Sequence, residues 1–112
     1  MADRAYLTEA MPMCVIWGRN DQIIPVRHAG NAAALAPSAR VEVLPNAGHF
    51  PHKDHPQRFV RIVNDFIRTT DAAAYDREDW RALLAAGPRI VPLQAEAAEA
   101  PIAPVHVMST GA

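Results

Sequence analysis

The segment VEVLPNAGHFPHKDHPQRF, residues 41–59, contains the features that decide the fold. It begins with a short and mostly apolar run, Val41–Leu44, which predicts a β-strand. The Asn-Ala-Gly sequence that follows predicts a turn, because Asn and Gly tolerate backbone conformations that other residues avoid. This turn leads into His49, and Pro56 stands where a helix could begin. A histidine on a loop at the carboxyl end of a strand is well placed to reach a ligand.

A second apolar run, Met13–Trp17, lies upstream and ends at Gly18. It does not alternate with polar residues, so it predicts a strand covered on both faces, as in a parallel sheet. Residues 26–36 are rich in alanine and predict a helix that Pro37 ends. Strand, helix and strand in succession predict a right-handed βαβ unit with parallel strands. The partial alternation of the second strand and the following Pro45 place that strand at a sheet edge.

Two further helices are expected downstream. Apolar residues repeat at helical spacing from Phe59 to Ile67, and Asp54 is the expected N-cap of this helix. A shorter helix is expected from about Arg77 to Ala85. Residues 87–112 contain several prolines and no sustained period, which predicts a Pro/Ala-rich, unstructured tail. Val105, His106 and Val107 could pair as a strand, but the tail is the favoured interpretation. The fold class is therefore α/β, with one partial domain over residues 1–86.

Composition and charge exclude several classes of partner. Eleven Lys and Arg residues oppose twelve Asp and Glu residues, and no basic or acidic cluster suggests nucleic acid or an anionic membrane as a partner. The first ten residues lack the apolar core of a signal peptide, and no apolar run is long enough to span a bilayer. We expect a soluble, cytoplasmic protein without a cofactor. Cys14 is the single cysteine, which excludes an internal disulfide.

Asp21 and His49 follow the carboxyl ends of the two predicted strands, where open α/β sheets assemble catalytic groups. Taken alone, Asp21 could simply build a turn and His49 could be a solvated loop residue. Their spacing across a βαβ unit favours a joint role. A carboxylate that accepts a hydrogen bond from the Nδ1–H group of a histidine fixes the ring tautomer, which leaves Nε2 free to accept a proton.

A metal site is an alternative interpretation of the same region. Three histidines and an aspartate lie within seven residues, namely His49, His52, Asp54 and His55. Imidazole and carboxylate groups bind transition metals, but this spacing matches no known zinc signature. A solvated segment that partly caps a helix is the favoured interpretation, so we expect no metal.

The motifs VIWGRNDQIIP (residues 15–25), RVEVLPNAGHFPHKDHPQRF (residues 40–59) and NDFIRT (residues 64–69) together resemble the C-terminal part of the α/β-hydrolase family. The resemblance covers roughly residues 8–70. It implies a partial parallel sheet of α/β-hydrolase type and identifies residues 1–86 with the C-terminal portion of that domain. It further implies that Asp21 is the acid and His49 the histidine of a Ser-Asp-His catalytic triad.

The nucleophile of that triad is not evident in the sequence. The family carries it in a G-x-S-x-G turn upstream of the acid, whereas the serines here are Ser38 and Ser109, outside any such motif. We therefore expect a truncated hydrolase that is inactive alone and would act on a small-molecule substrate only when a nucleophile-bearing segment complements it. The resemblance does not choose among esterase, epoxide hydrolase, dehalogenase and carbon–carbon bond hydrolase.

A second hypothesis belongs to another class of function. The strand Met13–Trp17 needs neighbours that the chain does not obviously supply, so one of its edges should be open. The chain could then be a non-catalytic interaction module or remnant that docks on a partner or self-associates through this open strand edge.

Overall fold

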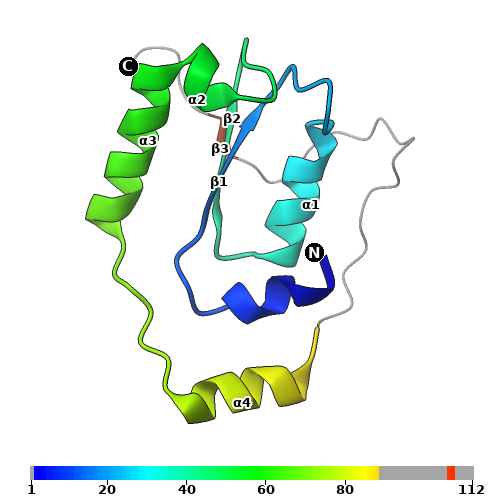
Figure 1. Cartoon of the computed structure of the whole chain (residues 1–112), viewed down its shortest axis with the longest axis vertical. Helices are drawn as coiled ribbons and strands as arrows, with labels where there is room; N and C mark the ends of the chain where they lie inside the picture. Colours follow the sequence, from blue (N-terminus) through cyan, green and yellow to red (C-terminus); the bar gives the residue numbers. More distant parts are fainter. Residues whose placement is uncertain (1, 89–105, 108–112) are drawn as a thin grey trace.

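The structure, a computed structural model, describes residues 2–88 and 106–107 (Figure 1). The elements in chain order are η1 (Ala2–Thr8, a 3₁₀-helix), β1 (Cys14–Gly18), α1 (Arg27–Leu35), β2 (Arg40–Leu44), α2 (Pro51–Asp54), α3 (Pro56–Thr69), α4 (Arg77–Ala86) and β3 (His106–Val107). The predicted strand, helix and strand are therefore β1, α1 and β2, and the α/β fold class is confirmed.

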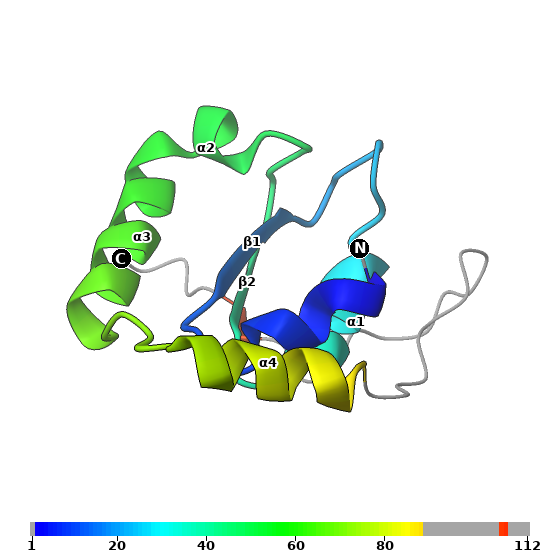
Figure 2. The ribbon, with the colours of Figure 1, turned by 60° about the horizontal axis from the view of Figure 1, so that its bottom comes forward.

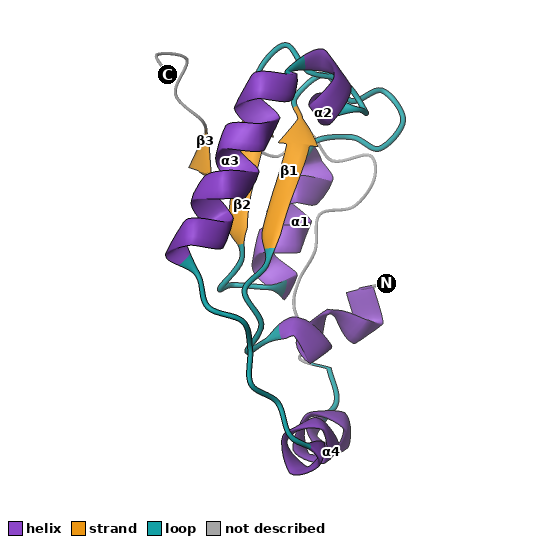
Figure 3. Cartoon of the chain, turned by 60° about the vertical axis from the view of Figure 1, so that its left-hand side comes forward, coloured by secondary structure: helices purple, strands orange, loops and turns teal. Residues whose placement is uncertain are grey.

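The sheet has the strand order β1-β2-β3, and both pairs of neighbours are parallel. Val15 pairs with Val41 and Trp17 with Val43, so β1 and β2 end at the same side of the molecule. Figure 3 shows α3 on one face of the sheet and α1 on the other. This three-layer arrangement is the one that a parallel sheet needs in order to bury both faces.

One prediction about the sheet is wrong. β2 was expected at an edge, but it lies between β1 and β3 because His106–Val107 pairs with its outer side. His106–Val107 falls within the predicted tail, residues 87–112, and forms the two-residue strand β3. A strand over residues 105–107 was the alternative that the sequence left open. The remainder of that predicted tail, residues 89–105 and 108–112, lies outside the described residues.

The core has one apolar cluster on each face of the sheet. On the α1 side, Ala29, Val41 and Val43 are buried, and Val15 and Trp17 pack against them. On the α3 side, the buried residues are Leu44, Ala47 and Ile62, with Cys14 and Ile16 packed against them. Alternate residues of β1 thus enter both clusters, as expected for a strand covered on both faces.

The strand β1 is nevertheless only half-buried along Cys14 to Trp17. Within the described sheet it is an edge strand, because β2 is its one neighbour. Burial raises the pKa of the Cys14 thiol, which disfavours the reactive thiolate. An open strand edge beside the core agrees with the expectation of an exposed edge at this strand.

The helix ends partly follow the predictions. Pro56 begins α3 as expected, but Asp54 is not its N-cap, since it is the last residue of α2 and His55 occupies the cap position. The helix α4 begins at a capping box in which Asp76 accepts a hydrogen bond from the backbone N–H of Asp79. It contacts η1 and lies far from α2 (Figures 1 and 2). No helix in the described part of the chain has the length and apolar character needed to cross a membrane.

Candidate active site

Asp21 and His49 lie side by side just beyond the carboxyl ends of β1 and β2. The Nδ1 atom of His49 is 2.9 Å from Oδ2 of Asp21. A carboxylate can only accept a hydrogen bond, so Nδ1 carries the proton and Nε2 is the basic nitrogen of the neutral ring. The structure therefore brings together the two side chains that the sequence singled out, in the geometry that orients a general base.

Asp21 is held in a fixed orientation by its own backbone. Its Oδ1 atom accepts hydrogen bonds from the N–H groups of Ile23 and Ile24, at 2.9 and 2.8 Å. Burial tends to raise the pKa of Asp21, whose side chain is 5% exposed. The hydrogen bonds from the Ile24 amide, His49 and the Ile23 amide outweigh that effect, so the pKa of Asp21 lies below its ordinary value. Asp21 is thus an ionised partner for His49 near neutral pH.

Gly18 allows the two loops that carry Asp21 and His49 to approach each other. A Cβ atom at Gly18 would lie 2.0 Å from the carbonyl oxygen of Gly48 and 2.5 Å from that of Ala47. The backbone N–H of Asn20 also donates to the Ala47 carbonyl at 2.9 Å. Only glycine leaves room for this backbone contact. The sequence signal was present, since Gly18 ends the strand, but the contact itself depends on the fold.

The loop that carries His49 is also tied to the turn that follows it. The backbone N–H of Gly48 donates to Oδ2 of Asp54 at 2.7 Å, and Nε2 of His55 lies 3.0 Å from the Asn46 carbonyl oxygen, to which it donates. Asn46 itself has a φ of 62°, a left-handed conformation that asparagine accepts more readily than most residues. Asp54 and His55, two of the four residues in the metal hypothesis, therefore bind the backbone of the loop.

The remaining residues of the metal hypothesis do not converge. His52 contacts the rings of Phe50 and Phe59, while His49 contacts Asp21. Across residues 2–88 and 106–107, no group of three or more His, Cys, Asp or Glu side chains is arranged to hold a metal ion.

Exposed apolar side chains flank the Asp21–His49 pair on both loops. Ile23 is 66% exposed and Phe50 is 53% exposed. The ring of Phe50 meets the ring of His49 edge to face, with centroids 4.9 Å apart. The side chain of His49 remains 30% exposed. These two side chains leave apolar surface beside the Asp21–His49 pair.

Residues 3–56 match the family model described as the alpha/beta hydrolase fold. With the parallel sheet and the resemblance of the two motifs, this match shows that the chain is related, over part of its length, to the α/β-hydrolase family. The expected partial sheet of α/β-hydrolase type is thereby confirmed. No solved structure matches the chain.

Several curated proteins are similar to this chain. An uncharacterized protein of Mycobacterium tuberculosis (strain H37Rv) is 49% identical over 87 residues, which cover 78% of this chain and 26% of that protein. The 2-hydroxymuconate semialdehyde hydrolase of Pseudomonas putida is 38% identical over 58 residues, or 52% of this chain and 21% of that enzyme. The biotin biosynthesis bifunctional protein of Teredinibacter turnerae is 40% identical over 57 residues, covering 51% of this chain and 10% of that protein. The chain spans about a quarter of the length of the Mycobacterium relative.

Proposed function

We propose that this chain carries the acid and the base of a Ser-His-Asp type hydrolase, with Asp21 as the acid and His49 as the base. The single observation that carries the proposal is the 2.9 Å contact between Asp21 Oδ2 and His49 Nδ1 at the carboxyl rim of a parallel sheet. The relationship to α/β-hydrolases supports it, because that family performs its chemistry at this rim.

In the proposed reaction His49 acts twice. Its Nε2 atom accepts the proton of a nucleophilic hydroxyl as the oxygen of that hydroxyl attacks the substrate, and Asp21 stabilises the imidazolium that forms. His49 then returns the proton to the leaving group. The same nitrogen next removes a proton from water, whose oxygen attacks the covalent intermediate. As the bond between the intermediate and the nucleophile oxygen breaks, His49 gives this proton to that oxygen, which restores the hydroxyl.

The nucleophile in this proposal comes from a segment other than these 112 residues. Ser38 lies before β2 and Cys14 begins β1, so both belong to the end of the sheet opposite to His49. Ser38 donates instead to the carbonyl of Glu9. We propose that the chain is inactive alone and that a nucleophile-bearing segment docks along the open edge of β1.

A chimera tests the proposal directly. In the 2-hydroxymuconate semialdehyde hydrolase of Pseudomonas putida, the 58 matching residues are replaced by the corresponding residues of this chain. We expect the chimera to hydrolyse 2-hydroxymuconate semialdehyde. Asp21→Asn and His49→Ala in the chimera should lower kcat by about 10⁴-fold, because each removes a member of the acid–base pair.

The matched controls separate chemistry from folding. His52 lies nearby but outside the pair, since its ring contacts Phe50 and Phe59, so kcat of His52→Ala is the reference for loss of a neighbouring imidazole. Circular dichroism of each variant is the reference for the fold. A folded chimera that keeps its kcat after His49→Ala would refute the assignment. Turnover of an activated ester by the isolated chain, abolished by His49→Ala, would refute the proposed need for a second segment.

A non-catalytic role is the second candidate, and the open edge of β1 favours it. The Met13 carbonyl and the Arg19 N–H both bond to β2, at Arg40 and Leu44. Alternate residues of a strand face the same neighbour, so the N–H groups of Cys14 and Ile16 point to the open edge. A second copy of the chain could pair there.

Substitution at the start of β1 tests whether the chain self-associates through the open edge of this strand. Cys14→Pro removes one outward N–H, while Cys14→Ala retains it and serves as the matched control. If the chain self-associates through this edge, light scattering coupled to size-exclusion chromatography should detect dimers in the wild type and in Cys14→Ala, and fewer in Cys14→Pro. A monomeric wild-type chain at high concentration would eliminate self-association.

A further inference from the structure

We propose that Asp54 is a positioning residue, which holds the loop carrying His49 so that its ring stays against Asp21. This inference rests on the proposed function, since it assigns a role to Asp54 within that same site. It is independent of which substrate the site takes.

The contact that carries the inference is a hydrogen bond from the peptide between Ala47 and Gly48, one peptide before the one that joins Gly48 to His49. Oδ2 of Asp54 accepts from the backbone N–H of Gly48 at 2.7 Å. A short bond from an amide to a carboxylate is charge-assisted and roughly twice as strong as a neutral one. Because this N–H belongs to the Ala47–Gly48 peptide, the bond fixes the peptide plane that precedes the Gly48–His49 peptide, and so restricts the direction in which the loop enters His49.

Gly48 has no side chain that could hold the peptide in this orientation. Its φ lies outside the left-handed range, and a Cβ atom built there would meet only Oδ2 of Asp54, at 3.5 Å. The preceding residue is fixed from the other side, since the Ala47 carbonyl accepts from the Asn20 N–H at 2.9 Å. Asp54 therefore completes a restraint that acts on both sides of the peptide between Ala47 and Gly48.

Helix capping does not explain the position of Asp54. It is the last residue of α2, its side chain is exposed, and α3 has His55 at its cap with no side-chain cap bond. The carboxylate instead turns back over the loop, six residues along the chain. A residue that stabilised only its own helix would lie at that helix's amino end.

The hydrogen-bonded Nδ1 proton of His49 provides a test that does not require turnover. Proton NMR of the full chain should detect this proton far downfield, with slow exchange into water, when the ring is held against Asp21. In Asp54→Ala we expect its exchange to accelerate on the order of tenfold, because losing one charge-assisted hydrogen bond increases opening of the loop by about that factor. Asp54→Asn keeps an oxygen acceptor, so it should restore part of the protection.

Asp76→Ala is the matched control, because Asp76 also accepts a backbone N–H, that of Asp79, at 2.8 Å, but does so at the start of α4. It should leave the Nδ1 proton of His49 unchanged. Circular dichroism verifies that each variant is folded, and Asp54→Asn carries the test if Asp54→Ala does not fold.

The outcomes separate this inference from the proposed function. A wild-type Nδ1 signal that is unaltered in both Asp54 variants overturns the positioning role alone. An inactive, folded chimera in which the Nδ1 signal persists overturns the proposed function alone. If the wild-type chain lacks a hydrogen-bonded Nδ1 proton, both proposals are wrong.

Discussion

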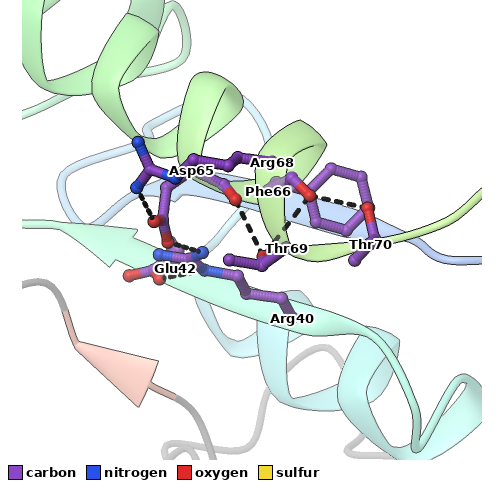
Figure 4. Close-up of polar contacts among 7 residues, drawn as sticks. All are labelled: Arg40, Glu42, Asp65, Phe66, Arg68, Thr69 and Thr70. Carbon is purple, nitrogen blue, oxygen red and sulfur yellow. Dashed lines mark hydrogen bonds and ion pairs between the residues drawn. The ribbon is translucent and has the colours of Figure 1, made fainter.

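Two regions flank the same strand, β2, and each pairs carboxylates with basic side chains. Beyond the carboxyl end of β2, His49 meets Asp21 at 2.9 Å. Around its amino end, an ion cluster consists of Arg40, Glu42, Asp65 and Arg68 (Figure 4). The contact distances are similar, so distance alone does not distinguish a site suited to proton transfer from one that only holds the fold.

The ion cluster joins β2 to α3. Arg40 donates from Nε to Glu42 at 2.7 Å and from Nη1 to Asp65 at 2.6 Å, and Arg68 donates to the other oxygen of Asp65. The hydrogen bond from Arg40 lowers the pKa of Asp65, and the bond to Asp65 raises the pKa of Arg40. The side chain of Glu42 is completely buried. A buried carboxylate needs such a partner, because an unpaired charge in the interior is costly.

What separates the two regions is the chemistry of the base. Arginine stays protonated in proteins and cannot exchange a proton with a substrate. An imidazole can both accept and donate a proton, and the ring of His49 keeps a second nitrogen, Nε2, beyond its contact with Asp21. The cluster therefore stabilises the packing of α3 on the sheet, whereas the Asp21–His49 pair is suited to catalysis.

The largest effect is expected from breaking the ion cluster. Arg40→Met leaves the buried Glu42 without its guanidinium, and we expect the free energy of unfolding to fall by about 3 kcal/mol. This is the low end of the range for buried pairs, since the side chain of Arg40 is 30% exposed. Urea denaturation of the full chain measures the change.

The double variant Arg40→Met/Glu42→Leu sharpens this test. Replacing both charged partners with apolar residues removes the uncompensated charge, so stability should return to within about 1 kcal/mol of the wild type. The Nδ1 proton of His49 should be unchanged, because the cluster lies at the other end of β2. A double variant less stable than Arg40→Met would contradict the view that the cluster is structural.

A smaller loss of stability, with a local effect on the site, is expected from Gly18→Ala. The added methyl group would collide with the carbonyl oxygens of Ala47 and Gly48, both of which belong to the backbone. We expect a cost of about 2 kcal/mol and displacement of the His49 loop. Gly48→Ala is the matched control, since a Cβ atom there meets only Asp54, in ordinary van der Waals contact.

Two measurements report on Gly18→Ala. Urea denaturation gives the stability, and the Nδ1 proton of His49 gives the integrity of the pair. The added methyl group should lower the stability and alter the Nδ1 proton signal of His49 in Gly18→Ala. It should change neither quantity in Gly48→Ala. Equal behaviour of the two variants would mean that close approach at Gly18 is not what brings the loops together.

The sequence was sufficient to predict the βαβ unit and the meeting of Asp21 with His49. Both follow from local rules, since a continuous apolar run ended by Gly18 predicts a parallel strand and parallel strands carry their loops to one side. The helix α3 was equally predictable, because its apolar residues recur at helical spacing from Phe59 to Ile67, which is more than two turns of helix.

Other features depend on contacts between distant residues. Glu42 resembles the solvent-facing residue of an alternating edge strand, but it is buried because Arg40 and, through it, Asp65 of α3 provide its environment. Asp54 has the residue type of an N-cap, yet its carboxylate bonds to the Gly48 amide once the loop folds back. The 3₁₀-helix η1 has no apolar period from which it could have been predicted.

The smallest expected effect concerns pH, and it compares the two regions through Asp21 and Asp65. Both carboxyl groups have a pKa below the ordinary value of 3.8, Asp21 because its hydrogen bonds outweigh its burial and Asp65 because Arg40 donates to it. A lowered pKa in the folded state means that each carboxylate stabilises the fold above pH 3.8 and loses this contribution as the pH falls through its folded pKa. Asp21→Asn and Asp65→Asn should therefore destabilise the chain at pH 6, and this deficit should shrink as the pH falls below 3.8, as measured by urea denaturation at each pH. The exposed Asp71, replaced by Asn, provides the reference. If the deficit of Asp21→Asn stayed constant down to pH 3, the ionised carboxylate would not be what holds His49.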